Sequence, residues 1–361
     1  MKIKQITLAV LALTAVGACS AAYADDANSV TIYGYVRAGV VNFNGAGNSA
    51  WGYAGNGAST SSTNVAGRAE INFKGTENLG NGLSSVWQVS NRFSPTGNGK
   101  DDQDGSLTGF ATNDTFVGLK SSTLGTLVMG TNYGNFEDGK YDNSVVVGPD
   151  QIQGWFGDTE GHNMVRYDLP TFAGINSSIQ YGTSENKSAS FSGNQLVSLN
   201  VNYDNGFWGV SGSFCSTSNV AVGSGITGQT ATFGWASNTG SVGTLGQAHL
   251  TAMIKPTDAL QLAVEFQRDS LQSDSQTKSA LYAYYTIGAA QVGVQGGYES
   301  FSGDKVAGLQ SGKFYDAFLH YNMSKTTMAY IEVMDSKDGY VGSNTPNTNR
   351  VMTDIGLNKS F

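Results

Sequence analysis

Apolar and polar side chains alternate one by one through much of this chain, and residues 65–74 show the pattern most clearly. An extended chain points successive side chains to opposite faces. One face of this segment is apolar, and the other carries Arg68, Glu70, Asn72 and Lys74. Charged side chains are costly against a dry core but not against water. A strand with one wet face and one apolar face is typical of a transmembrane β-barrel, whose lumen holds water and whose outside meets lipid.

Alternation alone does not separate such a barrel from a soluble β-sandwich, whose strands alternate too. The composition narrows the classes, because 48 glycines and only 5 prolines among 361 residues suit many strands joined by tight turns. Beyond residue 24, no apolar run is long enough for a transmembrane helix. The formal net charge is -8 at pH 7. Nucleic acid is therefore not an expected partner, since the chain lacks a basic patch that could neutralise phosphates.

Residues 1–24 have the features of a secretory signal peptide that is cleaved on export. Two lysines precede an apolar stretch over residues 6–18, and residues 22–24 supply a cleavage site of small side chains. We therefore expect residues 25–361 to form a single exported domain. Lipidation of Cys19 is the alternative, because the residues before it resemble a lipoprotein cleavage box.

Connections of two lengths separate the alternating segments. The short ones are at 121–125, 170–174, 204–206, 255–258, 288–290 and 324–325, and the long ones are at 184–194, 217–244, 270–278, 301–312 and 337–349. Their alternation predicts short turns on one rim of a barrel and long loops on the other. Seventeen segments result if residues 230–237 are included. An even number is needed if Phe361 closes the last strand against the first, so we place residues 230–237 in a loop and expect an all-β antiparallel barrel of 16 strands.

The connection over residues 133–163 is too long for an ordinary hairpin loop and too irregular for a strand. Structureless loops of this length in a compact domain are usually functional. Its charged side chains comprise one amine and six carboxylates: Glu137, Asp138, Lys140, Asp142, Asp150, Asp158 and Glu160. We expect this loop, which is the third long one, to fold into the lumen and to control what passes through it.

Several blocks of the sequence resemble general diffusion porins of the Gram-negative outer membrane, closest to the neisserial-type group of the betaproteobacteria. The matching blocks are residues 30–34 (VTIYG), 73–83 (FKGTENLGNGL), 115–119 (TFVGL), 165–174 (VRYDLPTFAG) and 355–361 (IGLNKSF). The resemblance implies a homotrimer of sixteen-stranded barrels in the outer membrane, surrounded by lipid and lipopolysaccharide. It also implies that the third long loop of each barrel folds inward.

The resemblance further implies a pore wall of basic residues opposite the acidic loop. The charged residues that we assign to the wall are Arg37, Arg68, Glu70, Lys74, Arg92 and Arg166. The basic pattern is thinner than in the family, since Glu70, Asn113 and Thr131 occupy places where bases are common. Because charges in a narrow bore act strongly on passing ions, the excess of loop carboxylates predicts a modest cation preference.

An enzyme is the main competing class, but the sequence offers no G-x-S-x-G elbow and no H-x-x-x-H pair. His320 and Asp316 share one face of a strand, where a solvated wall residue is the favoured interpretation. An acidic stretch at 100–105 lacks the ligand pattern of a calcium loop. We therefore expect no catalytic residue, metal or cofactor. The predicted function is passive diffusion of ions and small hydrophilic solutes; a solute-specific channel, and a barrel that acts mainly as an adhesin or receptor, are the alternatives.

Overall fold

The computed structural model describes residues 29–45, 62–96, 110–111, 113–132, 140–145, 161–183, 193–221, 242–303, 311–337 and 349–361. The expected signal peptide lies outside these residues, so its cleavage stays a prediction. The described strands are β1 (Ser29–Gly45), β2 (Ser62–Gly80), β3 (Leu83–Phe93), β4 (Thr115–Ser121), β5 (Gly125–Asn132), β6 (Gly161–Asp168), β7 (Ile175–Gly182), β8 (Gln195–Asp204), β9 (Trp208–Ala221), β10 (Val242–Ile254), β11 (Leu260–Leu271), β12 (Asp274–Ile287), β13 (Ala290–Ser302), β14 (Gly312–Asn322), β15 (Thr327–Lys337) and β16 (Asn349–Ser360).

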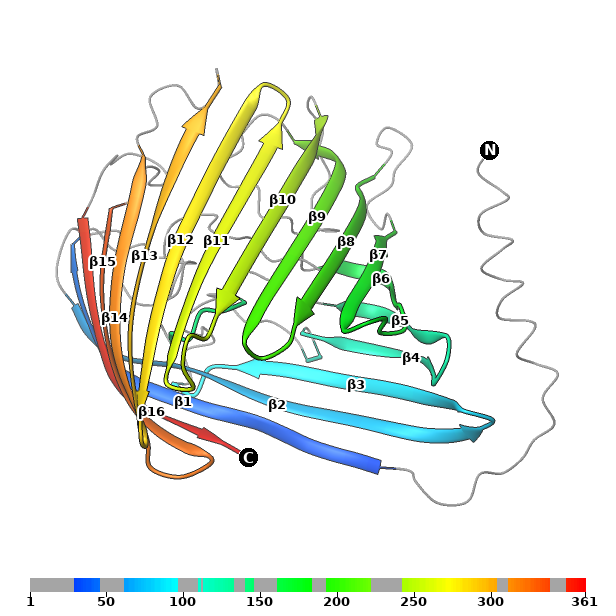
Figure 1. Ribbon diagram of the computed structural model, residues 1–361, viewed down its shortest axis with the longest axis horizontal. Coiled ribbons are helices and arrows are strands. Elements are labelled where there is room, and N and C mark those ends of the chain that lie inside the picture. The colour runs from blue at the N-terminus through cyan, green and yellow to red at the C-terminus, as the bar shows by residue number, and fades with distance from the viewer. Residues whose placement is uncertain are drawn as a thin grey trace.

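Each strand pairs with the next one in the sequence, and β16 pairs with β1 (Figure 1). The predicted closed antiparallel barrel of 16 strands is thereby confirmed. At the seam, the amide of Gly34 donates to the carbonyl of Phe361 at 3.1 Å, and the amide of Phe361 donates to the carbonyl of Gly34 at 3.0 Å. Closure leaves the sheet with no free edge, so every strand forms backbone hydrogen bonds with a neighbouring strand on both sides. Among the described residues, no helix could cross a lipid bilayer.

The two faces of the sheet have opposite character. Residues paired across neighbouring strands share a face, as Arg37 does with Arg68 and Glu70 with Arg92. On the outer face large apolar side chains are exposed, for example Leu281 at 65%. On the inner face polar side chains are buried, for example Glu299 at 0%. This is the reverse of a soluble protein, and it matches the expected lipid-facing exterior and polar interior.

The predicted separation into short and long connections holds with one exception. A long loop was expected at 270–278, but β11 and β12 continue through this region and pair from Ser270 with Ser275 and from Leu271 with Asp274. Gln272 and Ser273 form a two-residue turn in which Gln272 has a φ of 55°. The prediction was wrong because this region is rich in Ser, Gln, Asp and Lys, which favour a loop. At a barrel's inner positions the same residues continue a strand, and the Nζ of Lys278 lies 3.0 Å from the Oδ2 of Asp269 there.

The strand count does not depend on residues 230–237, which lie outside the described part of the chain. β9 and β10 pair directly with each other, from Trp208 with Ile254 to Ala221 with Val242. The connection between them is therefore shorter than the 217–244 that the sequence indicated, and no strand comes between β9 and β10 in the barrel.

Closure of the barrel makes the last strand sensitive to change. We expect deletion of Phe361 to reduce assembly, because it removes both seam hydrogen bonds with Gly34. Leu357 is 54% exposed on the outer face, and Leu357→Asp should cost on the order of 1–2 kcal/mol by placing a carboxylate against lipid. The measurement is the yield of folded, heat-modifiable protein in the outer membrane.

The matched control is Asn358→Asp, which puts the same charge one residue further on, at an inner position that pairs with Arg37. It should assemble like the unchanged protein. Equal yields for Asn358→Asp, Leu357→Asp and the deletion would show that the membrane-facing side and the seam have been assigned incorrectly.

Candidate pore lining and inner loop

The structure places all of the wall residues that the sequence indicated on the inner face of β1 to β6. Register fixes their positions, because each pairs with another inner residue: Arg37 with Arg68, Glu70 with Arg92, Lys74 with Gln88, and Arg166 with Gln180. Lys120 on β4 belongs to the same face, since it pairs with Ser84 and Thr126. The sequence analysis did not select Lys120, although its parity within residues 115–121 would have identified it.

Two of these bases are held by carboxylates on the same wall. The Nε of Arg92 donates to Oε1 of Glu70 at 2.9 Å, and the Nε of Arg166 donates to Oδ1 of Asp168 at 2.7 Å. Glu70, which interrupts the basic pattern of the sequence, is thus balanced locally by its cross-strand neighbour. The Nζ of Lys74 lies 4.6 Å from the ring centroid of Tyr33, a geometry that suits a cation–π contact.

A segment of the long loop, residues 140–145, lies against the inner face on the other side of the barrel. The amide of Val145 donates to Oε1 of Glu332 on β15 at 2.5 Å, and the amide of Asn143 donates to the hydroxyl of Tyr284 on β12 at 3.2 Å. Arg37 on β1 donates to the carbonyl of Val145. These partners belong to strands on both sides of the seam, so residues 140–145 pass inside the barrel.

Apolar contacts support the same placement. The ring of Tyr141 is buried in a cluster formed with Met253, Ala263, Ala280, Tyr282, Tyr284, Phe314 and Phe318. Val145 packs against a second cluster, formed by Val41, Tyr330, Met334 and Met352. We call these two clusters the apolar floor; they lie on the inner face of β10 to β16 and β1. The sequence analysis missed them. Their signal was the Met, Phe and Tyr residues at inner positions of these strands, which a uniformly water-lined wall would not need.

The same half of the barrel carries buried carboxylates, of which the sequence analysis selected only Asp316. It expected Asp316 and His320 to be solvated, and this was wrong, because both side chains are buried. The buried carboxylates are Glu265, Asp269, Asp274, Glu299, Asp316, Glu332 and Asp354, and all are nearly inaccessible. Glu265 accepts from the hydroxyl of Tyr282 at 2.5 Å and lies 2.5 Å from Nε2 of His249. Glu332 lies 2.9 Å from Nε2 of His320, whose ring stacks on Phe318 at a centroid distance of 4.1 Å.

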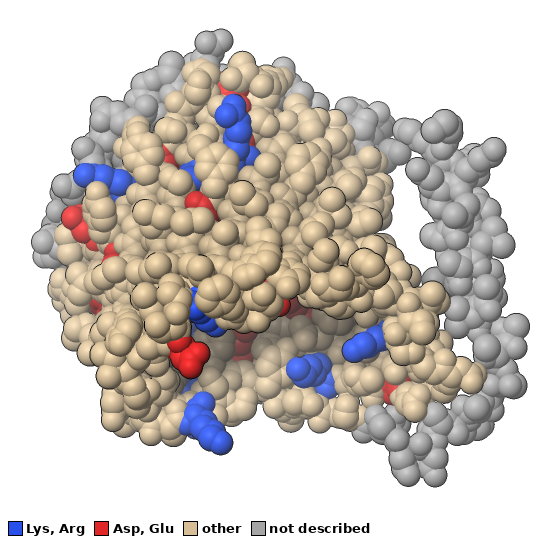
Figure 2. All heavy atoms as spheres, in the orientation of Figure 1, with Lys and Arg blue, Asp and Glu red and all other residues tan. Residues whose placement is uncertain are grey.

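The inner face is therefore divided into a half that carries the bases, on β1 to β6, and a half with buried acids, on β11 to β16. Lys74 and Lys120 are the exposed bases of the first half, whereas Arg37 and Arg68 are buried. Figure 2 shows a hollow above β1 to β3, with basic side chains along its lower border and acidic ones at its back. No group of His, Cys, Asp and Glu within the described ranges could hold a metal ion. Cys215 lies buried in the middle of β9, beside Met164 and Leu196.

Of the seven charged loop residues, the structure describes only Lys140 and Asp142. Asp142 accepts from the amide of Ser144 at 2.8 Å and from its hydroxyl at 2.9 Å, which closes a turn inside the segment. The Nζ of Lys140 lies 5.9 Å from the ring centroid of Tyr141. The other five, Glu137, Asp138, Asp150, Asp158 and Glu160, lie outside the described residues.

Comparison with known proteins gives one family and a consistent set of relatives. The model of the Gram-negative porin family matches residues 7–345. The Major outer membrane protein P.IB of Neisseria gonorrhoeae is 33% identical over 147 residues, which are 38% of this chain and 38% of that protein. The match thus spans less than half of that relative's length.

Two solved structures share the fold. An anion-selective porin from Comamonas acidovorans superposes with a TM-score of 0.70 at 17% identity, over 93% of this chain and 100% of that one. OmpT of Vibrio cholerae in its trimer form gives a TM-score of 0.63 at 14% identity, over 93% and 100%. Together with the closed barrel and its apolar exterior, the family match shows that this chain belongs to the Gram-negative porins and is a protein of the outer membrane.

Proposed function

We propose that the protein is a water-filled channel through which ions and small hydrophilic solutes diffuse passively across the outer membrane. The observation that carries this proposal is a closed sixteen-stranded barrel with polar and charged side chains on its inner face. A barrel of this size is wide enough to leave an aqueous passage unless something fills it. Porins are channels and not enzymes, so the family match gives no support to a catalytic role.

The inner loop restricts this passage. Residues 140–145 pack on the apolar floor and bond Glu332, so the open part of the bore lies along β2 to β8. Lys74 and Lys120 are exposed there, and the side chain of Arg166 is 32% exposed, whereas Glu332 behind the loop is fully buried. We assign the constriction to Lys140 and Asp142 together with the loop carboxylates Glu137, Asp138, Asp150, Asp158 and Glu160.

The proposed ion preference follows from these two sets of charge. The exposed wall is mainly basic, because Glu70 and Asp168 are each paired with an arginine. The loop carboxylates outnumber the loop amine by six to one, and our proposal assigns them to the constriction. At ~0.15 M salt the screening length is about 8 Å, so charges at the constriction act on a passing ion more strongly than distant ones. We therefore propose a modest cation preference that the wall bases reduce.

The assembly that we propose is a homotrimer embedded in lipid and lipopolysaccharide. It is supported by the apolar outer face and by the trimer form of the Vibrio cholerae barrel. Sedimentation in detergent tests it: a mass of three chains is expected, and a stable single chain would contradict the proposal.

The inner segment can be released without touching the outer face. Glu332→Ala removes the acceptor of the Val145 amide and the neighbour of His320. A buried acceptor that is lost leaves its donors unpaired, at about 1–3 kcal/mol. We expect the segment to detach part of the time, which raises single-channel noise and the size of the largest sugar admitted in liposome swelling.

Asp335→Ala is the matched control, since Asp335 is an exposed carboxylate on the same strand. It should leave noise and size limit unchanged. Glu332→Gln, which keeps a carbonyl acceptor, should fall between the two. An unchanged size limit in Glu332→Ala would mean that this contact does not hold the restriction in place.

The wall bases are tested by removing exposed charge. Lys74→Gln with Lys120→Gln should move the zero-current potential under a KCl gradient further toward the cation-selective sign, because two positive charges leave the open wall. Lys359→Gln removes a lysine from an outer position that pairs with Val36, and should not move it. An anion-selective potential for the unchanged channel would contradict the proposed preference. No conductance in planar bilayers would contradict the channel itself.

A further inference from the structure

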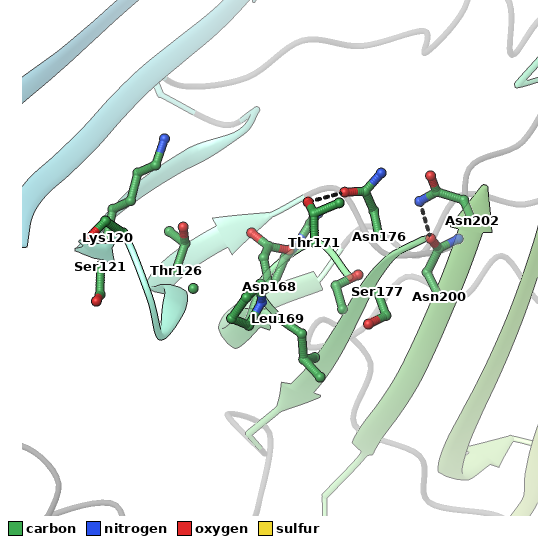
Figure 3. Close-up of a pocket in the computed structure, with 15 residues that line it drawn as sticks. Lys120, Ser121, Thr126, Asp168, Leu169, Thr171, Asn176, Ser177, Asn200 and Asn202 are labelled. Atoms are coloured by element: carbon green, nitrogen blue, oxygen red, sulfur yellow. Dashed lines mark hydrogen bonds and ion pairs between the residues drawn. The ribbon is translucent and has the colours of Figure 1, made fainter. Parts of the chain in front are cut away.

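A polar recess opens on the inner face of β4 to β8, next to the rim with the short turns, and its volume is about 590 Å³. Figure 3 shows Lys120 at one side of it, Asn200 and Asn202 at the other, and Asp168 between them. Residues 140–145 contact β1 and β9 to β16, and none of them lines the recess. Its lining is set by strand pairing, so it is built into the wall.

The charges of the recess favour an anion. Lys120 and Arg166 line it together with a single carboxylate, Asp168. That carboxylate accepts the Nε–H of Arg166 at 2.7 Å, an arrangement that engages one edge of the guanidinium. Lys120 is exposed on the β4 side. The recess thus has a positive charge in excess, and a bound monoanion would balance it.

The other side of the recess offers hydrogen bonds without charge. Ser178 pairs across strands with Asn200, and Asn176 with Asn202, so four polar side chains form a compact block. The Nδ2 of Asn202 donates to Oδ1 of Asn200 at 3.1 Å, and Oγ1 of Thr171 donates to Oδ1 of Asn176 at 2.6 Å. The Nδ2 of Asn200 donates in turn to the hydroxyls of Ser213 at 2.7 Å and Ser211 at 3.3 Å, which fixes this side chain in place. The amide nitrogens of Asn176 and Asn202 are the donors that the block offers to a ligand that accepts. The block suits hydroxyl groups, which accept and donate.

Two simpler ligands fit less well. None of the lining residues is aromatic, so the recess has no platform on which a neutral sugar ring could stack. Apolar acids would meet little apolar surface, since Leu169 and Pro170 are the only large apolar side chains in the lining. Both a negative charge and several hydroxyl groups are needed to use the two sides together.

We propose that this recess is a binding site for small polyhydroxylated carboxylates, whose carboxylate lies between Lys120 and Arg166 and whose hydroxyl groups contact the Asn and Ser block. The inference rests on the proposed channel function and adds to it a solute class. Binding at the rim would raise the local concentration of such solutes at the mouth of the bore and make their flux saturable.

The test is block of single-channel KCl current by gluconate added to the short-turn side. Gluconate should reduce the current with a saturable concentration dependence, because a bound solute obstructs ions. Sorbitol has the hydroxyl groups without the charge, and acetate has the charge without the hydroxyl chain. Both should block at least tenfold less strongly, since each loses one set of hydrogen bonds.

Variants separate binding from general electrostatics. Lys120→Gln combined with Arg166→Gln should raise the half-blocking gluconate concentration about tenfold. Lys74→Gln removes an exposed inner lysine outside the recess lining, and should leave that concentration unchanged within twofold. Asp168→Asn should lower the half-blocking gluconate concentration, because a carboxylate that repels the ligand is lost. If the ligand were instead held through a cationic group, the same variant would weaken binding.

One result would overturn the inference in a channel that conducts KCl normally before solute is added. It is a current that falls linearly with solute concentration, without saturation, and equally for gluconate and sorbitol. Equal loss of block in Lys74→Gln and in the double variant would overturn the inference too, because the bore's overall charge would then be responsible. Absence of any KCl current is a separate result, which contradicts the channel and not the recess.

Discussion

The hydrocarbon core of a bilayer offers no water to a peptide group, and the rest of this structure depends on that constraint. Every backbone amide and carbonyl within the membrane needs a protein partner, which for strands requires a closed sheet. Pairing of β1 with β16, down to the exchange between Gly34 and Phe361, supplies it. Once the sheet is closed, each side chain must face either lipid or lumen. Apolar and polar residues alternate along the sequence because successive side chains face lipid and lumen in turn.

A closed barrel of sixteen strands satisfies the backbone hydrogen bonds but leaves a wide bore. The two halves of its inner face differ in how they restrict that bore. On β10 to β16, inner positions include apolar clusters and buried acids, and residues 140–145 pack against them. On β2 to β8, inner positions carry bases and uncharged amides, with Lys74 and Lys120 exposed and a recess open beside Lys120. Glu332 and Arg37 join the halves, because each bonds a different backbone group of Val145. The wall thus both holds the restriction and lines the path beside it.

Local periodicity explains why much of this could be predicted from sequence. Parity along a strand is a two-residue property, so the inner positions of Arg68, Glu70 and Lys74 could be read directly, and the strand number followed from closure. The β11–β12 hairpin could not, since polar residues at inner positions look like a loop when the neighbouring strand is unknown. The apolar floor under Tyr141 was equally hidden. It depends on where a loop distant in sequence packs, and no local pattern encodes that. Five of the loop carboxylates lie outside the described residues, so their role at the constriction stays a prediction.

The central claim is that one face of each strand meets the water of a conducting bore and the other does not. Single cysteines at neighbouring positions test it most directly, in a background where Cys215 is replaced by serine. Phe73 and Lys74 on β2, and Val165 and Arg166 on β6, form pairs that differ only in the face they occupy. We expect a charged, membrane-impermeant thiol reagent to modify the cysteines at 74 and 166 quickly and to reduce the single-channel current. Cysteines at 73 and 165 should react slowly and without effect on current. Equal reaction within each pair, or reaction that leaves the current unchanged at 74 and 166, would contradict the account.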